Sequence, residues 1–133
     1  MPKVLIVEDD SSWQRIHRTA LERILEKSDI VVVSSYEDAT SRLVVEYAAY
    51  ILDGEFPRQQ GQTPQRLGIG LAEEIHSRSV PYDRIIIASG NSSLLKEARA
   101  LGIEKIYSKG SPNIEAGERD IQQLAKDLKP LLR

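Results

Sequence analysis

The sequence predicts an α/β domain in which one parallel sheet lies between two layers of helices, a doubly wound, three-layer sandwich. Five short apolar runs are rich in β-branched residues and do not alternate with polar residues, which is typical of strands buried on both faces. Segments with helical spacing separate these runs, so strands and helices alternate along the chain. This alternation favours right-handed crossovers between parallel strands. The strands are expected at 4–7, 30–33, 50–52, 85–88 and 105–107.

Capping residues and helix breakers mark the ends of the expected helices. Ser11 or Ser12 is available to cap the first helix. Ser35, with Asp38 three residues later, has the pattern of a capping box for the second helix. Gly102 is a stop signal for the fourth helix. The helices are expected at about 13–25, 35–43, 70–78, 91–101 and 121–128.

Composition excludes several classes of protein. The 133 residues fit one domain, spanning 1–133, and leave little room for a second. The formal net charge of −2 argues against direct nucleic-acid binding, and the absence of cysteine excludes disulfides and thiolate metal sites. No segment approaches the roughly 20 apolar residues that span a bilayer. We therefore expect a cytoplasmic domain without membrane contact.

A polar stretch at 58–66 contains the breakers Gly61 and Pro64, and we interpret it as part of an extended surface loop at about 58–69. The strand–helix alternation resumes after it, so it does not read as an interdomain linker. Gly61, Gly68 and Gly70 are expected to make this loop mobile. Two roles stay open for it: a tolerated insertion, or a segment that gates access to a neighbouring site.

Polar side chains follow four of the expected strands at their carboxyl ends. They are Glu8, Asp9, Asp10, Asp53, Ser89 and Lys109. In an open α/β sheet these strand ends form the binding crevice. Clustered carboxylates suit a hard divalent cation, and Mg²⁺ is the natural choice. A carboxylate can accept a phosphoryl group if a metal and an ammonium group neutralise the developing charge, and a hydroxyl can bond a phosphoryl oxygen.

Four runs of the sequence resemble the receiver domain of two-component response regulators. They are VLIVEDD at 4–10, ILDGEFP at 51–57, IASG at 87–90 and YSK at 107–109. The runs keep the order and approximate spacing of the family over nearly the whole chain. The resemblance implies a flavodoxin-like fold with a five-stranded parallel sheet in the order 2-1-3-4-5.

The resemblance also implies roles for the acidic residues. Asp53 matches the aspartate that is phosphorylated. Glu8 and Asp9 match the acidic pair that binds Mg²⁺, with Asp9 the better match to the direct ligand, and Asp10 would be a flanking, structural acid. The backbone carbonyl of Glu55 would complete the protein's share of the metal coordination, and its carboxyl group occupies a position that tunes phosphoryl lifetime.

The resemblance extends to the residues that respond to phosphorylation. Ser89 matches the switch hydroxyl, Lys109 the phosphate-binding lysine, and Tyr107 an aromatic residue whose ring reorients into the space that Ser89 vacates. The sequence departs from the family pattern directly after Lys109, because Gly110 stands where the family usually has proline in a cis peptide bond. We therefore expect a trans peptide there and a different path for the loop at 110–113.

The expected function is a phosphorylation-dependent signalling switch. A sensor histidine kinase or a histidine phosphotransfer protein would supply the phosphoryl group, and the output would be the binding of a downstream protein or a homodimer. The chain is not expected to be an enzyme beyond its own phosphorylation and dephosphorylation. Two alternatives stay open: a phosphorelay intermediate and a metal-dependent phosphohydrolase. Against the second, Glu55 stands where haloacid-dehalogenase-type enzymes have a second aspartate.

Three further residues attract attention without a clear chemical pattern. His17 and His76 lie on separate expected helices and lack metal-ligand spacing, so both are expected to be ordinary helix residues. Trp13, in the first turn of the first expected helix, is expected in the core or at the edge of a groove.

Overall fold

The computed structural model describes residues 2–109 and 114–132. A five-stranded parallel sheet forms its centre, in the order β2-β1-β3-β4-β5, which confirms the expected topology. The strands are β1 (Val4–Val7), β2 (Ile30–Val33), β3 (Ala49–Asp53), β4 (Ile85–Ser89) and β5 (Ile106–Ser108). Strand β1 pairs with β2 on one side and with β3 on the other, so that Val7 lies beside Val33 of β2 and beside Leu52 of β3.

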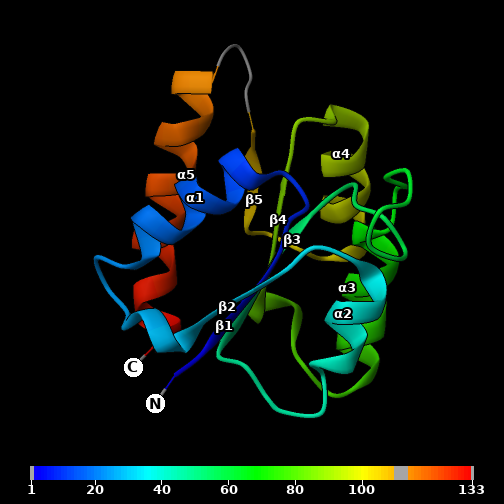
Figure 1. The fold of residues 1–133 in the computed structure, drawn as a ribbon, viewed down its shortest axis with the longest axis horizontal. Coiled ribbons are helices and arrows are strands. Elements are labelled where there is room, and N and C mark those ends of the chain that lie inside the picture. The colour runs from blue at the N-terminus through cyan, green and yellow to red at the C-terminus, as the bar shows by residue number, and fades with distance from the viewer. Residues whose placement is uncertain (1, 110–113, 133) are drawn as a thin grey trace.

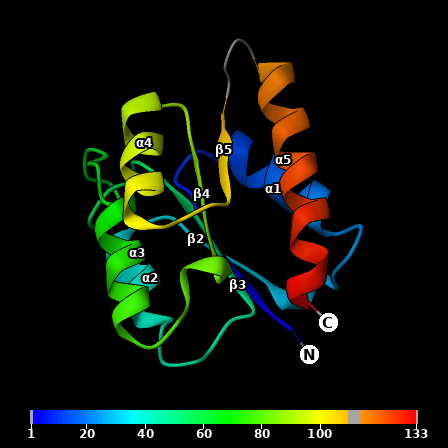
Figure 2. The ribbon, with the colours of Figure 1, turned by 180° about the vertical axis from the view of Figure 1, so that it is seen from behind.

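Two layers of helices cover the sheet, so the three-layer sandwich is confirmed. The helices are α1 (Ser11–Leu21), α2 (Tyr36–Ser41), α3 (Gly68–Ser77), α4 (Ser92–Leu101) and α5 (Ile114–Leu128). Figures 1 and 2 show α1 and α5 on one face of the sheet and α2, α3 and α4 on the other. Short 3₁₀ turns at Lys27–Asp29 and Tyr82–Arg84 lead into β2 and β4, and a third, Lys129–Leu132, follows α5. None of the described helices is long and apolar enough to cross a membrane.

Each face of the sheet has its own apolar core, because successive strand residues point to opposite faces. In β4, Ile85 and Ile87 pack under α2, α3 and α4, whereas Ile86 and Ala88 pack under α1 and α5. Both sets are fully buried. This double burial explains why the strand sequences are continuously apolar.

The helix caps differ from expectation at one place. Asp10, not Ser11 or Ser12, caps α1: its carboxylate accepts hydrogen bonds from the backbone N–H groups of Ser12 (2.8 Å) and Trp13 (3.1 Å). An aspartate can satisfy two free N–H groups at once, and its charge suits the positive end of the helix. The expected caps at Ser35, which accepts from the backbone of Asp38, and at Gly102 are confirmed.

The two ends of the loop between β3 and α3 are paired with each other. Phe56 and Gln65 form an antiparallel bridge, with N–H to carbonyl distances of 3.0 Å in both directions. The Phe56 side chain is fully buried, whereas residues 58–66 are exposed. Helix α3 already begins at Gly68, so the loop is two residues shorter than expected at that end.

Candidate functional site

Three carboxylates meet at the carboxyl edge of the sheet. Oxygen atoms of Glu8, Asp9 and Asp53 lie within 4.8 Å of one another. Glu8 is 1% and Asp53 9% exposed, and Asp9 is half-buried. The neighbouring Asp10 is exposed and its carboxylate is used in the cap of α1. A set of carboxylate oxygens this close together fits a hard divalent cation such as Mg²⁺ or Mn²⁺.

Lys109 reaches the same cluster from the end of β5. Its ammonium group forms ion pairs with Glu8 and with Asp53, the second at 3.2 Å from Nζ to Oδ1. The Lys109 side chain is only 8% exposed. The carboxylates are therefore partly neutralised by an internal cation.

Burial shifts the pKa values of this cluster. Burial raises the pKa of Glu8 to about 8, with a further rise from the charge of Asp53 and an opposing effect of Lys109. Burial also raises the pKa of Asp53, again against the effect of Lys109. For Lys109, burial lowers the pKa, but Glu8 and Asp53 raise it more, so its net shift is upward. Burial thus makes the two carboxyl groups harder to ionise, whereas the carboxylates keep the ammonium group of Lys109 charged.

Two glycines allow the backbone to close tightly around Asp53. A Cβ atom on Gly68 would lie 2.4 Å from the backbone oxygen of Asp53, and one on Gly54 would lie 2.7 Å from Oγ of Ser89 and 2.7 Å from a methyl group of Leu94. Real Cβ atoms essentially never come so close. Their roles were missed from the sequence, although a glycine directly after a site aspartate is a signal of close backbone approach.

Ser89 lies at the end of β4, on the sheet face that α2, α3 and α4 cover. Its side chain is buried, and Oγ accepts a hydrogen bond from the backbone N–H of Asn91 at 3.1 Å. Asn91 in turn caps α4 through its side-chain oxygen. The Ser89 hydroxyl therefore lies between the backbone that follows Asp53 and the start of α4.

Tyr107 lies on the opposite face of the sheet from Ser89. In the ladder between β4 and β5, Ser108 is the partner of Ser89 and Tyr107 is the partner of Ala88. The Tyr107 ring packs with the core under α1 and α5, and its hydroxyl donates to Asp127 of α5. Burial and this carboxylate raise the pKa of Tyr107. The expected pairing of the Tyr107 ring with the space beside Ser89 does not occur in this structure.

The loop that follows Asp53 is tied to α4. The Asn91 side-chain amide donates to a carboxylate oxygen of Glu55 at 3.3 Å. Further along the loop, Arg66 forms an ion pair of 3.2 Å with Glu97. The side chain of Glu55 is thus held by the N-cap of α4. The peptide bond before Gly110 and the loop at 110–113 lie outside the described residues.

The two histidines have different surroundings. His76 is exposed, its Nδ1 lies 2.8 Å from the backbone oxygen of Val80, and its ring stacks on Tyr82. His17 is 2% exposed, and its Nδ1 has no hydrogen-bond partner within the described part of the chain. Neither belongs to the carboxylate cluster. Burial, with a smaller effect of the Lys109 charge, lowers the pKa of His17 to about 3.

The neutral state of His17 predicts a pH-dependent stability. Below its unfolded pKa of 6.5 the unfolded chain takes up a proton that the folded chain refuses, so stability is lost as the pH falls from 6.5 towards 3. At pH 5 the loss is about 2 kcal/mol. Urea unfolding at pH 7.5 and pH 5 measures it. His17→Leu should remove this part of the pH dependence, whereas His76→Gln should retain it. An equal dependence in wild type and His17→Leu contradicts the assignment.

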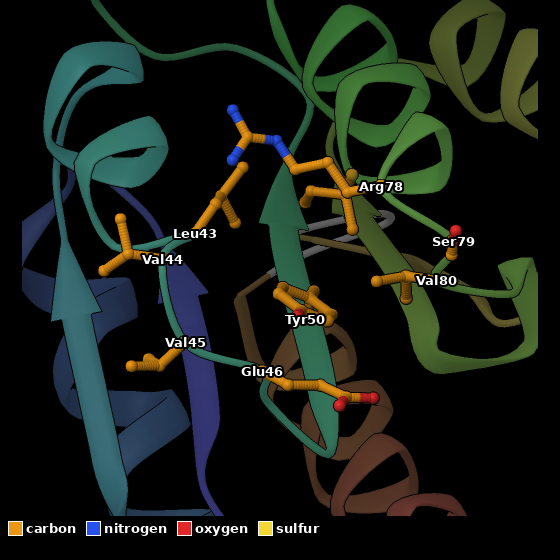
Figure 3. A pocket seen from close by; sticks show the side chains of 9 residues that line it. Leu43, Val44, Val45, Glu46, Tyr50, Arg78, Ser79 and Val80 are labelled. Carbon is orange, nitrogen blue, oxygen red and sulfur yellow. The ribbon is translucent and has the colours of Figure 1, made fainter.

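A hollow of about 300 Å³ lies at the other edge of the sheet (Figure 3). Its walls come from the turn between α2 and β3, from β3, and from the end of α3, and include Val44, Glu46, Tyr50 and Arg78. Val44 and Val45 are its exposed apolar residues. None of the residues of the carboxylate cluster lines it. The hollow is therefore separate from the carboxylate cluster.

No protein-family model matches this sequence, and no curated protein matches it. Solved structures do match. The receiver domain of the Francisella response regulator 1452 aligns at 20% identity and a TM-score of 0.63, covering 95% of this chain and 98% of that one. The phosphorylated cyanobacterial phytochrome response regulator RcpA aligns at 18% identity and 0.70, covering 94% and 91%.

A third similar structure is the Mn²⁺-bound form of the response regulator Rcp1, at 15% identity, a TM-score of 0.71, and 93% and 91% coverage. At such identities the likeness concerns the fold, and it extends over nearly the whole of each chain. The chain has the flavodoxin-like fold of response regulator receiver domains.

Proposed function

We propose that this chain is a response regulator receiver domain that accepts a phosphoryl group on Asp53. The observation that carries the proposal is the ion pair between Lys109 and Asp53 inside a cluster of three carboxylates. The fold and the four sequence runs support it, and so do a phosphorylated and a Mn²⁺-bound protein among the similar structures. The chain would act in the cytoplasm, and the phosphodonor would be a sensor histidine kinase or a histidine phosphotransfer protein.

The transfer is a displacement at phosphorus. A carboxylate oxygen of Asp53 attacks, the bond between phosphorus and the leaving nitrogen or oxygen of the donor breaks, and an acyl phosphate forms. Lys109, already beside Asp53, stabilises the negative charge that gathers on the phosphoryl oxygens. Asp9, Glu8 and Asp53, with the backbone carbonyl of Glu55, would hold Mg²⁺. When bound, Mg²⁺ supplies further charge neutralisation at the same oxygens.

Ser89 is the proposed switch residue. Its hydroxyl lies beside Gly54 and next to the N-cap of α4, so a rotation of the Ser89 side chain towards a phosphoryl oxygen on Asp53 would draw it away from the backbone N–H of Asn91. That change would alter the start of α4 and, through it, a surface for a downstream protein or a second copy of the chain. Tyr107 lies on the other face, so it would not follow Ser89. Any response of Tyr107 would pass through β5 and Asp127.

The test is incorporation of phosphate from labelled acetyl phosphate in the presence of Mg²⁺. Wild type should become labelled and Asp53→Asn should not, because the amide cannot act as the nucleophile. Asp83→Asn, an exposed aspartate outside the cluster, is the matched control and should be labelled like wild type. Equal labelling of wild type and Asp53→Asn contradicts the proposal. Turnover of phosphoesters without labelled protein would instead indicate a phosphohydrolase.

A further inference from the structure

Trp13 faces the ammonium group of Lys109. The distance from Nζ to the centre of the indole ring is 5.3 Å, within the range of a cation–π interaction. Trp13 lies in the first turn of α1, where its backbone N–H is fixed by the cap residue Asp10. It is half-buried and is the one tryptophan of the chain. The indole is therefore a third neighbour of the lysine, and it comes from a different element from those that supply the two carboxylates.

The ammonium group thus has two kinds of partner. Glu8 and Asp53 bind it through ion pairs, and Trp13 contacts it through the ring. These partners differ in one respect: both carboxylates belong to the cluster that can hold a metal ion, and the indole does not. A cation in that cluster would compete with Lys109 for these carboxylates, whereas the indole ring of Trp13 offers a metal ion no carboxylate ligand.

We infer that Trp13 is a positioning residue for Lys109, which keeps the ammonium group beside Asp53 when the metal ion takes over Glu8. This inference rests on the proposed phosphoryl transfer. The aromatic face attracts a cation without fixing the direction of its N–H groups, so Lys109 can turn from Glu8 to a phosphoryl oxygen while it stays on the ring. Loss of the ring would leave the lysine mobile at the moment when its charge is needed.

A simpler role for Trp13 is packing, because its side chain also contacts the core under α1 and α5. The two roles predict different rank orders for the labelling rates of Trp13 variants. A cation–π contact weakens from tryptophan to phenylalanine and is lost in leucine. A packing role depends on apolar volume, so phenylalanine and leucine should behave alike. Ile16→Ala removes apolar volume from the same helix and the same core, and serves as the control.

The experiment measures the initial rate of labelling from acetyl phosphate with saturating Mg²⁺, at a temperature where all variants are folded by circular dichroism. Trp13→Leu should be about fivefold to tenfold slower than wild type, which is the size of one partly desolvated cation–π contact. Trp13→Phe should lie between the two, and Ile16→Ala should stay within about twofold of wild type. Equal rates for wild type and Trp13→Leu, or for Trp13→Phe and Trp13→Leu, overturn the inference.

A second measurement does not depend on phosphorylation. The fluorescence of Trp13 should change when Lys109 is replaced by methionine, and should change less when it is replaced by arginine, which keeps a cation near the ring. Identical emission spectra from wild type, Lys109→Met and Lys109→Arg would contradict the contact between Trp13 and Lys109. If wild type is not labelled at all, the proposed function fails. If wild type is labelled and Trp13→Leu is labelled as fast, only the role of Trp13 fails.

Discussion

Gly68→Ala should lower the free energy of unfolding by about 3 kcal/mol. The added Cβ would lie 2.4 Å from the backbone oxygen of Asp53 and 2.8 Å from Cα of Gly54. Both neighbours are backbone atoms, so no side chain can rotate away and either α3 or the end of β3 must move. Because β3 is fully buried between β1 and β4, the helix is expected to shift and to loosen the segment around Asp53.

Gly70→Ala is the matched control in the same helix. A Cβ on Gly70 meets no atom within 4 Å, and the residue is exposed. Alanine is the better helix former, so this variant should gain about 0.5–1 kcal/mol. Urea unfolding of the three proteins therefore gives shifts of opposite sign. A stabilised or unchanged Gly68→Ala would show that the close approach to Asp53 is not rigid.

Mg²⁺ should raise the thermal stability of the wild-type protein. On the proposed function, the ion would bind where Glu8, Asp9 and Asp53 converge, a set of ligands that the unfolded chain does not hold together. At a concentration about 100-fold above the dissociation constant, the added stability is about 2.7 kcal/mol. Asp9→Asn removes one charged ligand and should abolish most of this gain. Thermal unfolding monitored by circular dichroism, with and without Mg²⁺, measures the difference.

Asp10→Asn is the control that distinguishes an effect on metal binding from an effect on the cap of α1. Asparagine is as good a cap as aspartate, so α1 should stay intact, and residue 10 lies outside the carboxylate cluster. This variant should respond to Mg²⁺ like wild type. If Asp9→Asn gains as much stability as Asp10→Asn, the ion does not bind through Asp9.

The sheet and the carboxylate cluster could be predicted because both depend on local signals. Buried parallel strands have continuous apolar sequences, and their carboxyl ends necessarily meet at one edge. Glu8 follows β1 and Asp53 ends the adjacent β3, so their approach needs only the strand order. The cap of α1 was missed because Asp10 and Ser11 are both good capping residues and adjacent, and propensity alone does not rank the two positions.

Other features depend on tertiary geometry. The side of the sheet on which Tyr107 lies follows from the register of β5 against β4, and that strand has only three residues. A shift of one residue exchanges the two faces, and the order of residues in the chain does not fix the register. The contact of Trp13 with Lys109 joins the first helix to the last strand, so no local pattern indicates it.

The bridge between Phe56 and Gln65 has a practical consequence for protein engineering. Residues 58–64, between these two paired positions, form an exposed excursion, and Gly61 has a left-handed φ of 88° with no atom near its Cβ position. The bridge holds the two ends of the excursion together, so a peptide tag or a small reporter inserted beside Gly61 would not pull on β3 or on α3. The fold therefore offers an internal attachment point in addition to its two termini.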